Sequence, residues 1–552
     1  MPISISRRQA LIGFSSTLLV PAACGRSGPD SLPGNVFAHS VASGDPDRTS
    51  VVIWTRVSGY DAPVNVDWFV ATDHEFNDVA AKGQVATGSE RDYTVKAVVE
   101  GLSPGQSYFY RFVAEGEASP VGQTKTLADG HLERLVIAVA SCSNYPFGYF
   151  NAYEAIANDP DVDVVAHLGD YIYEYPEGGY GGGTGKRIGR LHKPRHETTT
   201  LDDYRVRHAQ YKSDAGSRAM HARHPLIVIW DDHESANNPW MEGAENHQAG
   251  EGNWFRRRAD SLQAFFEWMP VRDPEPGQPP ENYWRHYRFG DLVSLVTLES
   301  RHTGRSEQIY WGDLMRFESA EAAEAYYRDV IGAEHRNFLS GEMEVFLSAS
   351  LRESVEANRR WRVIGNQSVM ARVRIPPLDD PYFAHLRSVL DTAGQRSLDN
   401  LSRMGELGAV SDLDAWSGYP AARERFFQVA KEAGVHDLLV ISGDSHKYWA
   451  NVLYDDQGQG MGVEFGTTGI TSPEGLGLGL DGLARYDEAV AAANREVVWT
   501  DGRHRGFIRL EVDHDGARAD FVKVTNVETR DYETRVVYTA NIANENGALS
   551  YL

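Results

Sequence analysis

Short apolar runs alternate with amphipathic stretches from about residue 132 onward, and this alternation constrains the fold more than any other feature of the chain. Buried strands are predicted at 135–141, 162–168, 225–230, 292–298, 361–365 and 437–442. Helices are predicted at 149–158, 203–222, 254–268, 341–359 and 420–433. Because several strands end in Asp, His, Asn or Gln, we expect one active site assembled from many strand ends.

The preceding segment, residues 35–127, has the short β-rich runs and turn residues of a small all-β module. Residues 101–108 resemble the corner of a fibronectin type III domain, where a tyrosine hydroxyl bonds to the upstream backbone. We therefore expect a sandwich in which Tyr108 is architectural, with a domain boundary at residues 128–131. Its predicted strands are 50–56, 64–70, 94–99 and 108–113.

The first 24 residues have the pattern of an export signal. Arg7 and Arg8 precede an apolar stretch at 11–20 that is too short to span a bilayer comfortably. This pattern predicts twin-arginine export, which moves folded proteins, whereas the alternative is a chance basic N-terminus. We expect the export machinery as a partner and a periplasmic or extracellular location.

Cys24 ends this signal at a site that resembles a lipoprotein cleavage site. Pro21 stands where such sites usually have leucine, so the pattern is weaker than the arginine pair. A lipid on Cys24 would tether the protein to a membrane. No other segment of the sequence approaches a transmembrane helix.

Charge and cysteine content restrict the ligands of the chain. With a formal net charge of −24, sequence-independent DNA binding is not expected, and a phosphate site needs local positive charge or metal ions. Only two cysteines occur, so no disulfide framework is expected. Cys142 follows the strand predicted at 135–141 and is either a small buried hydrophobe or a metal ligand. Taken alone, it favours the hydrophobe.

The second predicted strand ends at Gly169-Asp170, and Tyr173 follows. Asp170 could bridge two cations through its two oxygens. Tyr173 could bind a strong Lewis acid such as ferric iron as a phenolate, or it could be a packing residue. His167 lies inside the strand and is interpreted as a hydrogen-bonded core histidine.

The third predicted strand ends at Asp231-Asp232-His233, with Asn237 just beyond it. Two adjacent carboxylates at a buried strand end are unfavourable unless a cation balances them. A surface cap is the alternative, but the apolar run immediately before them argues against it. His233 could protonate a leaving alkoxide.

Two further strand ends carry polar pairs. Asn366 and Gln367 follow the strand at 361–365, and amide oxygens can coordinate a hard cation. Asp444 and His446, two residues apart, could face neighbouring metals. The glycine-rich stretch at 177–187 lacks the spacing of a phosphate-binding P-loop, and we interpret it as a flexible loop near the site.

Together these motifs resemble the calcineurin-like metallophosphoesterase superfamily, and their full text resembles the PhoD-type alkaline phosphatase and phosphodiesterase family. The similarity runs from about residue 35 to about 525. The segments that carry it are 41–46, 140–142, 167–174, 200–205, 208–213 and 230–234. The resemblance implies an α+β fold, with a metallophosphoesterase β-sandwich flanked by helices at 132–552 behind a fibronectin-III-like domain at 35–128.

The resemblance also implies a metal centre. By position, Fe³⁺ would be held by Cys142, Asp170, Tyr173 and His446. Asp170 would bridge to Ca²⁺, whose other ligands would be Asp444 and one or both of Asp231 and Asp232. Asn237, Asn366 and Gln367 are further candidate ligands. At Glu299 the family usually has aspartate, so we assign this longer side chain no metal role.

The function that the resemblance implies is hydrolysis of phosphate monoesters and diesters by a secreted, monomeric enzyme. His233 and Asp170 are the expected catalytic residues, and the metals would neutralise phosphoryl oxygens and activate the nucleophile. One alternative is a phosphodiesterase or phospholipase D acting mainly on phospholipids or other extracellular diesters. A more distant alternative is a non-catalytic phosphate- or metal-binding surface protein.

Overall fold

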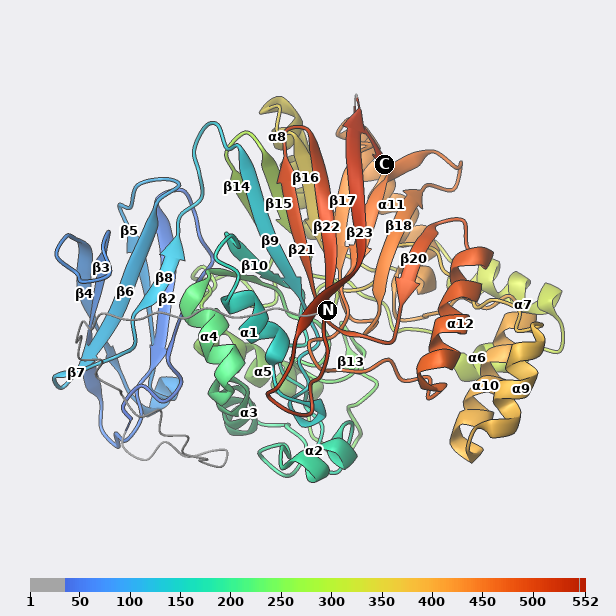
Figure 1. Ribbon diagram of the computed structural model, residues 1–552, viewed down its shortest axis with the longest axis horizontal. Coiled ribbons are helices and arrows are strands. Elements are labelled where there is room, and N and C mark those ends of the chain that lie inside the picture. Colours follow the sequence, from blue (N-terminus) through green and yellow to red (C-terminus); the bar gives the residue numbers. More distant parts are fainter. Residues whose placement is uncertain (1–34, 546) are drawn as a thin grey trace, which may run out of the picture. The chain divides into compact units, whose positions relative to one another are not determined.

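Two large β-sheets form the centre of the structure, a computed structural model that describes residues 35–545 and 547–552 (Figure 1). The predicted signal at 1–24 and Cys24 lie outside the described residues. In the first sheet, ten strands follow the order Ala548–Tyr551 (β24), Thr534–Glu545 (β23), Gly516–Val524 (β22), Arg505–Asp513 (β21), Arg134–Ala140 (β9), Val164–His167 (β10), Leu226–Val228 (β11), Val41–Gly44 (β1), Ser50–Arg56 (β2) and Thr94–Glu100 (β5).

The second sheet has seven strands and faces the first. Its order is Arg285–Phe289 (β14), Val293–Thr297 (β15), Trp361–Gly365 (β16), Leu438–Ser442 (β17), Gly460–Gly466 (β19), Tyr448–Tyr454 (β18) and Val497–Asp501 (β20). Strands β15, β16, β17 and β19 run parallel to their neighbours in this series, as β9, β10 and β11 do in the first sheet. The strand ends in each parallel set therefore gather on one edge.

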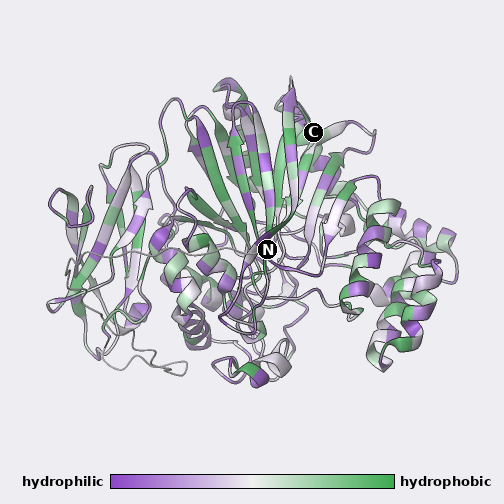
Figure 2. Cartoon of the chain, in the orientation of Figure 1, coloured by the Kyte–Doolittle hydropathy of each residue, from purple (hydrophilic) through white to green (hydrophobic). Residues whose placement is uncertain are grey.

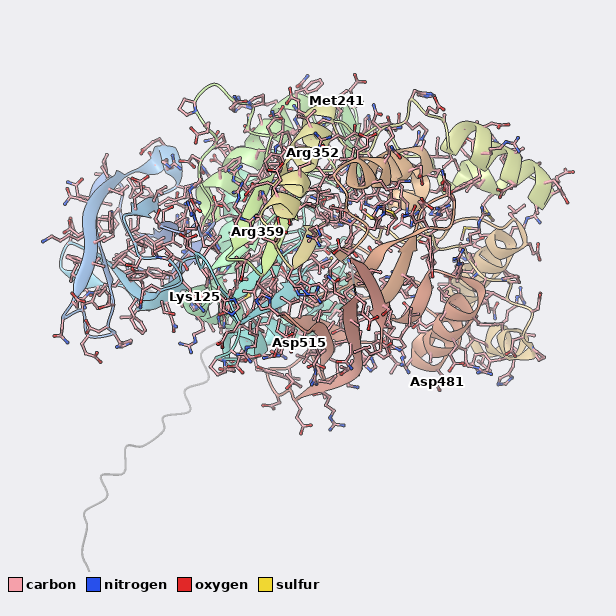
Figure 3. All side chains as sticks on the ribbon, turned by 90° about the horizontal axis from the view of Figure 1, so that it is seen from above. Lys125, Met241, Arg352, Arg359, Asp481 and Asp515 are labelled. Carbon is pink, nitrogen blue, oxygen red and sulfur yellow. The ribbon has the colours of Figure 1, made fainter. Side chains whose placement is uncertain are left out.

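Side chains alternate between two apolar cores. Val363 of β16 packs between the sheets with Ile137 of β9, whereas the next residue, Ile364, packs outward in a second core. Leu347 and Leu351 of helix α8 (Gly341–Glu356) belong to this second core. Helix α8 therefore covers the outer face of the seven-stranded sheet, and its exposed face carries Arg352 (Figure 3). In Figure 2, hydrophobic residues, drawn in green, are frequent along the strands of both sheets.

The remaining helices connect or cover the sheets. They are Asn151–Ala157 (α1), Gly182–Ile188 (α2), Leu201–Ser213 (α3), Ala215–Arg223 (α4), Trp254–Trp268 (α5), Trp311–Met315 (α6), Ala320–Tyr326 (α7), Pro381–Val389 (α9), Thr392–Glu406 (α10), Pro420–Glu432 (α11) and Gly479–Ala493 (α12). Within the described ranges, the helices are too short or too polar to cross a bilayer.

The prediction of a single helix at 203–222 is wrong, because Asp214 divides it into α3 and α4. Asp214 has an extended backbone (ψ 139°), and its carboxylate accepts a hydrogen bond from the Gly216 amide at 2.8 Å. This is the geometry of a helix N-cap, so a new helix starts there. The glycine-rich stretch is also more ordered than predicted, since residues 182–188 form α2.

The N-terminal module shares a sheet with the rest of the chain. Strands β1, β2 and β5 extend the ten-stranded sheet, because Gly44 pairs with Leu226 of β11. Its other sheet contains Val79–Thr87 (β4), Val64–Ala71 (β3), Ser107–Ala114 (β6), Glu117–Ala118 (β7) and Gly122–Lys125 (β8). The predicted tyrosine corner is confirmed, since the Tyr108 hydroxyl accepts a hydrogen bond from the Ser103 amide at 2.8 Å.

Candidate metal centre

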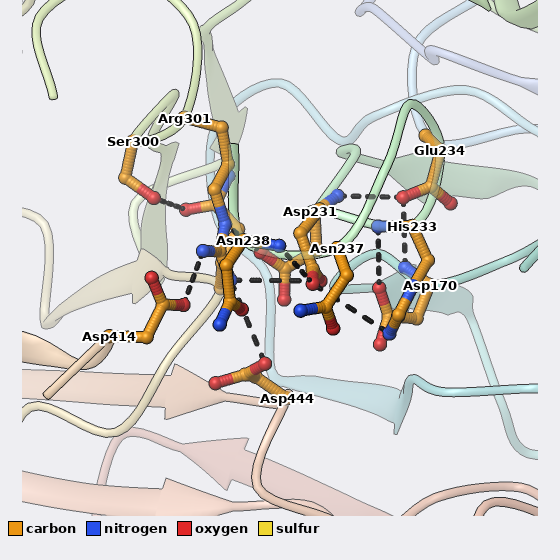
Figure 4. Close-up of polar contacts among 12 residues, drawn as sticks. Asp170, Asp231, His233, Glu234, Asn237, Asn238, Ser300, Arg301, Asp414 and Asp444 are labelled. Carbon is orange, nitrogen blue, oxygen red and sulfur yellow. Dashed lines mark hydrogen bonds and ion pairs between the residues drawn. The ribbon is translucent and has the colours of Figure 1, made fainter. Parts of the chain in front are cut away.

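The polar strand ends of both sheets meet at one place. Cys142 follows β9, Asp170 follows β10, and Asp232 follows β11 in the ten-stranded sheet. Asp444 and His446 follow β17 in the facing sheet. The parallel strands thus bring together side chains that are up to 304 residues apart in number, as His446 minus Cys142 shows. Figure 4 shows the part of this place that contains Asp170, Asp231 and Asp444.

Three groups of side chains at this place have the spacing of metal sites, and Asp170 belongs to all three. One group contains His233 with Asp170 and Asp232, and the other two contain predicted iron ligands and predicted calcium ligands. Ligand atoms of Cys142, Asp170 and His446 lie within 4.8 Å of one another. The same limit holds for the carboxylate group, whose members are Asp170, Asp231, Asp232 and Asp444. A side chain shared by two such groups can bridge two cations through its two oxygens.

The backbone at these positions is unusual. Cys142, Asp170, Asp444 and His446 all have positive φ, at 60°, 55°, 62° and 56°. This left-handed region is uncommon for residues other than glycine, and such residues cluster at functional sites. The surrounding sheets therefore hold four of the candidate ligands in conformations that an isolated chain would rarely adopt.

The carboxylates fit a cation because two of their buried oxygens accept no hydrogen bond, and the Arg301 guanidinium lies 3.7 Å from one of them, Oδ1 of Asp232. Oδ2 of Asp231 and Oδ1 of Asp232 are buried and accept no hydrogen bond from a described residue. Burial, followed by the charges of Asp232 and Asp231, raises the pKa of Asp170 well above its ordinary value. Three buried carboxylates and a partly buried fourth, so close together, are stable as anions only if positive charge balances them.

The thiol and phenol also lie where a metal would ionise them. Burial, and after it Asp170, raises the pKa of the Cys142 thiol. The Tyr173 hydroxyl donates to Oδ2 of Asp170 at 3.0 Å and lies 3.2 Å from Nε2 of His446. Nδ1 of His446 lies 3.0 Å from the Pro473 carbonyl oxygen, so an N–H there leaves the Nε2 lone pair directed at the cluster.

His233 lies beside the cluster and is held by a carboxylate that the sequence did not reveal. Its Nδ1 lies 2.7 Å from Oε2 of Glu174, and its ring stacks on Tyr173 at 4.1 Å between centroids. Burial alone would lower the pKa of His233, but Asp232 and Glu174 outweigh it and raise the pKa to about 9. The raised pKa favours the doubly protonated ring, which carries an N–H on Nε2, 3.7 Å from Oδ2 of Asp232.

Glu234 is a second carboxylate that sequence reasoning did not assign. It accepts hydrogen bonds from the backbone amides of Asp170 at 3.0 Å, Tyr171 at 2.6 Å and Asp231 at 2.8 Å. It thus joins the ends of β10 and β11. The position of Glu234 directly after Asp231-Asp232-His233 indicates that it lies near the site. Its role as a hydrogen-bond acceptor could not be predicted, because it depends on contacts between strands.

Arg301 supplies the fixed positive charge of the site. Its guanidinium Nε donates to Asp231 at 2.5 Å, Nη1 pairs with Asp414, and Nη2 lies 3.6 Å from Asp444. Nη2 is buried and has no hydrogen-bond partner among the described side chains or backbone. It also lies 3.7 Å from Oδ1 of Asp232. The neighbouring Glu299 carboxylate accepts the Arg301 amide at 2.9 Å, which agrees with a structural role.

The amide side chains predicted as further ligands bond mainly to protein groups. The Gln367 amide nitrogen donates to the carbonyl oxygens of Trp230 at 3.1 Å and Leu298 at 2.8 Å. The Asn366 carbonyl oxygen accepts the Trp416 indole N–H at 3.1 Å. The side-chain amides of Asn366 and Gln367 therefore connect strand ends to neighbouring segments of the protein.

Two tyrosines beyond β10 line the edge of the cluster. The Tyr175 hydroxyl donates a hydrogen bond to Oδ1 of Asn237 at 3.1 Å. Asn237 is the third amide predicted as a metal ligand, and its side-chain oxygen thus has a partner within the protein. The Tyr180 hydroxyl donates to the Pro473 carbonyl at 3.0 Å and lies 3.3 Å from Nδ1 of His446. The glycine-rich stretch that includes Tyr180 therefore does lie near the site, as predicted.

Comparison with known proteins agrees with this arrangement. Residues 137–521 match the model of the PhoD-like phosphatase family, and residues 23–128 match that of the PhoD-like phosphatase N-terminal domain. Alkaline phosphatase D of Bacillus subtilis (strain 168) is 34% identical over 500 residues, which cover 88% of this chain and 77% of that protein. A solved structure of PhoD superposes with a TM-score of 0.77 at 29% identity, covering 95% of this chain and 93% of the other.

Proposed function

Because the chain belongs to the PhoD-like phosphatase family and is a phosphoric ester hydrolase, we propose that it hydrolyses phosphate monoesters and diesters at the cluster around Asp170. The observation that carries this proposal is the membership of Asp170 in both the group of candidate iron ligands and the group of candidate calcium ligands. A bridging carboxylate between two cations is the arrangement that in-line phosphoryl transfer commonly uses.

We propose Fe³⁺ and Ca²⁺ as the cations. Cys142, Asp170, Tyr173 and His446 would hold Fe³⁺. Asp170, Asp444, Asp231 and Asp232 would hold Ca²⁺, since each of the last two keeps one oxygen without a described hydrogen-bond partner. When bound, these cations would neutralise phosphoryl oxygens and activate the water nucleophile.

The chain's own side chains would complete the reaction. The free N–H of Arg301 Nη2 would donate to a nonbridging oxygen of the phosphoryl group and stabilise the charge that develops there. His233 would give the proton on Nε2 to the leaving alkoxide oxygen as the P–O bond breaks. Glu174 would hold the imidazole ring in place through Nδ1.

Replacement of Cys142 tests the iron assignment. We expect Cys142→Ala to lose iron and most of its activity, because the remaining ligands provide no thiolate. Cys142→Ser should lose iron as well, while filling the same space. Iron content measured by mass spectrometry, with the melting temperature as a control for folding, checks this result. A Cys142→Ala protein with full iron and full activity would defeat the assignment.

The substrate preference can be measured directly. Turnover of p-nitrophenyl phosphate, compared with that of its bis ester, separates a monoesterase from a diesterase. We expect both to be hydrolysed. Exclusive hydrolysis of the bis ester and of phospholipids would favour the phosphodiesterase or phospholipase D alternative. Failure to hydrolyse either phosphate ester, with metals added, would contradict the proposed function.

We also propose that residues 1–24 direct twin-arginine export to the periplasm or beyond, on the basis of the Arg7-Arg8 pair and the short apolar stretch. Replacement of both arginines by lysine should retain the protein in the cytoplasm. Cell fractionation with an activity assay checks this, and unchanged export of the doubly substituted protein would contradict it.

A further inference from the structure

A second cluster of metal-binding side chains lies away from the catalytic residues, and we propose that it binds one divalent transition-metal ion such as Zn²⁺. Its members are His131, Asp291 and His514, whose ligand atoms lie within 4.8 Å of one another. Two imidazoles and one carboxylate form a donor set that suits Zn²⁺, with the fourth position left for water.

The distances within this cluster are close to those of a metal site. Nδ1 of His131 lies 3.0 Å from Oδ2 of Asp291, and Nε2 of His514 lies 3.7 Å from its Oδ1. Adjacent ligand atoms in a tetrahedral zinc site are about 3.3 Å apart, given metal–ligand bonds of roughly 2.0–2.1 Å. The two imidazole rings are stacked, with 4.9 Å between their centroids. Their planes are 20° apart, so at least one ring has to turn before both lone pairs point at one ion.

The backbone around the carboxylate is already fixed by hydrogen bonds. The Asp291 amide donates to the Gly130 carbonyl at 2.8 Å, and the Leu132 amide donates to Oδ1 of Asp291 at 3.0 Å. Gly130 has a positive φ of 86°, which glycine adopts without strain. Nε2 of His514 lies 3.1 Å from the Leu132 carbonyl oxygen and would exchange this contact for the metal. The carboxylate is thus held in place before an ion binds, and the imidazole rings would turn to meet the ion.

The cluster is separate from the catalytic centre. His131 lies before β9 and Cys142 lies after it, so the seven-residue strand places them about 20 Å or more apart. The side chains of Asp291 and His514 are 41% and 38% exposed, so an ion can reach them from solvent. The net charge of −24 also favours the approach of cations.

The position of the cluster indicates what a bound ion would do. Asp291 lies in the turn between β14 and β15 of the seven-stranded sheet. His514 lies in the turn between β21 and β22 of the ten-stranded sheet, and the residue that follows it in the sequence, Asp515, is labelled in Figure 3. His131 belongs to the segment that connects the N-terminal module to β9. One ion would join both sheets and this segment, and would stabilise the fold without taking part in turnover.

Titration of ZnCl₂ into the metal-loaded enzyme tests this proposal. Wild type should bind one more Zn²⁺ than His131→Ala or His514→Ala. At a hundredfold excess of Zn²⁺ over Kd, the melting temperature of wild type should rise by about 2–3 °C, and that of these two variants should not rise. The exposed His385, replaced by alanine, is the matched control and should behave as wild type. Hydrolysis of p-nitrophenyl phosphate before the addition of Zn²⁺ should be equal in all four proteins.

Equal zinc stoichiometry in wild type and both cluster variants would overturn the proposal, as would equal melting shifts. Iron and calcium contents measured before and after the titration show whether Zn²⁺ has displaced catalytic metals. If every protein takes up Zn²⁺ and loses an equal amount of iron or calcium, the result contradicts a separate zinc site at His131, Asp291 and His514.

Discussion

Asp170→Asn is expected to remove bound metal and to lower turnover of phosphate monoesters by about 10³-fold or more, since metal ions contribute several kcal/mol of transition-state stabilisation. Asparagine has almost the same shape, so the fold should persist. Asparagine lacks the second anionic oxygen, through which Asp170 would bind a second cation. The measurement combines metal analysis with steady-state hydrolysis of p-nitrophenyl phosphate.

The same substitution is expected to stabilise the metal-free protein against unfolding. Burial and the neighbouring charges of Asp232 and Asp231 disfavour the ionised form of Asp170 in the folded state. A neutral asparagine removes this repulsion, so the metal-free variant should unfold at a higher temperature than metal-free wild type. The exposed Asp129, replaced by asparagine, is the control and should change neither property. An Asp170→Asn enzyme with full metal content and normal turnover would contradict the bridging role.

His233→Gln is expected to lower turnover of alkyl phosphates by about 10²–10⁴-fold while iron and calcium remain bound, since this is the usual contribution of a general acid. Nδ1 of His233 lies 2.7 Å from Glu174, and the positive charge that this contact favours puts a proton on Nε2. An alkoxide needs that proton to depart, whereas p-nitrophenolate departs readily without it. The loss should therefore be much smaller for p-nitrophenyl phosphate than for an alkyl phosphate.

Two controls distinguish this role from simple damage to the site. Glu174→Gln should show a weaker form of the same dependence on the leaving group, because it acts only through the orientation and charge of His233. The exposed His196, replaced by glutamine, should have normal kinetics. Equal losses for both substrates, accompanied by loss of metal, would instead make His233 a ligand, as its proximity to Asp170 and Asp232 permits.

Local pattern in the sequence was sufficient to predict most of the catalytic region. The strand at 361–365 and the helix at 254–268 have the predicted bounds because their apolar periodicity is uninterrupted. The strand-end residues Cys142, Asp170 and Asp444 come together as expected, since parallel strands align their carboxyl ends. The break at Asp214 was missed because a helix cap inside a periodic stretch looks like an ordinary polar position.

Features that depend on contacts between distant segments could not be predicted. Pairing of Gly44 with Leu226 merges the N-terminal module into the catalytic sheet, and nothing near either residue specifies it. The role of Arg301 depends on the carboxylates that other strands bring to it, so its place in the sequence did not indicate it. The contact between the Gln367 amide nitrogen and the Trp230 carbonyl likewise joins segments that are far apart in the sequence.

This chain is expected to hydrolyse phosphate esters with metals held at the cluster around Asp170. The most direct measurement removes metal from the purified protein with a chelator and then restores Fe³⁺ and Ca²⁺, while p-nitrophenyl phosphate turnover and bound metal are followed together. We predict that turnover falls and recovers in proportion to bound metal. Undiminished turnover by metal-free protein would contradict this expectation.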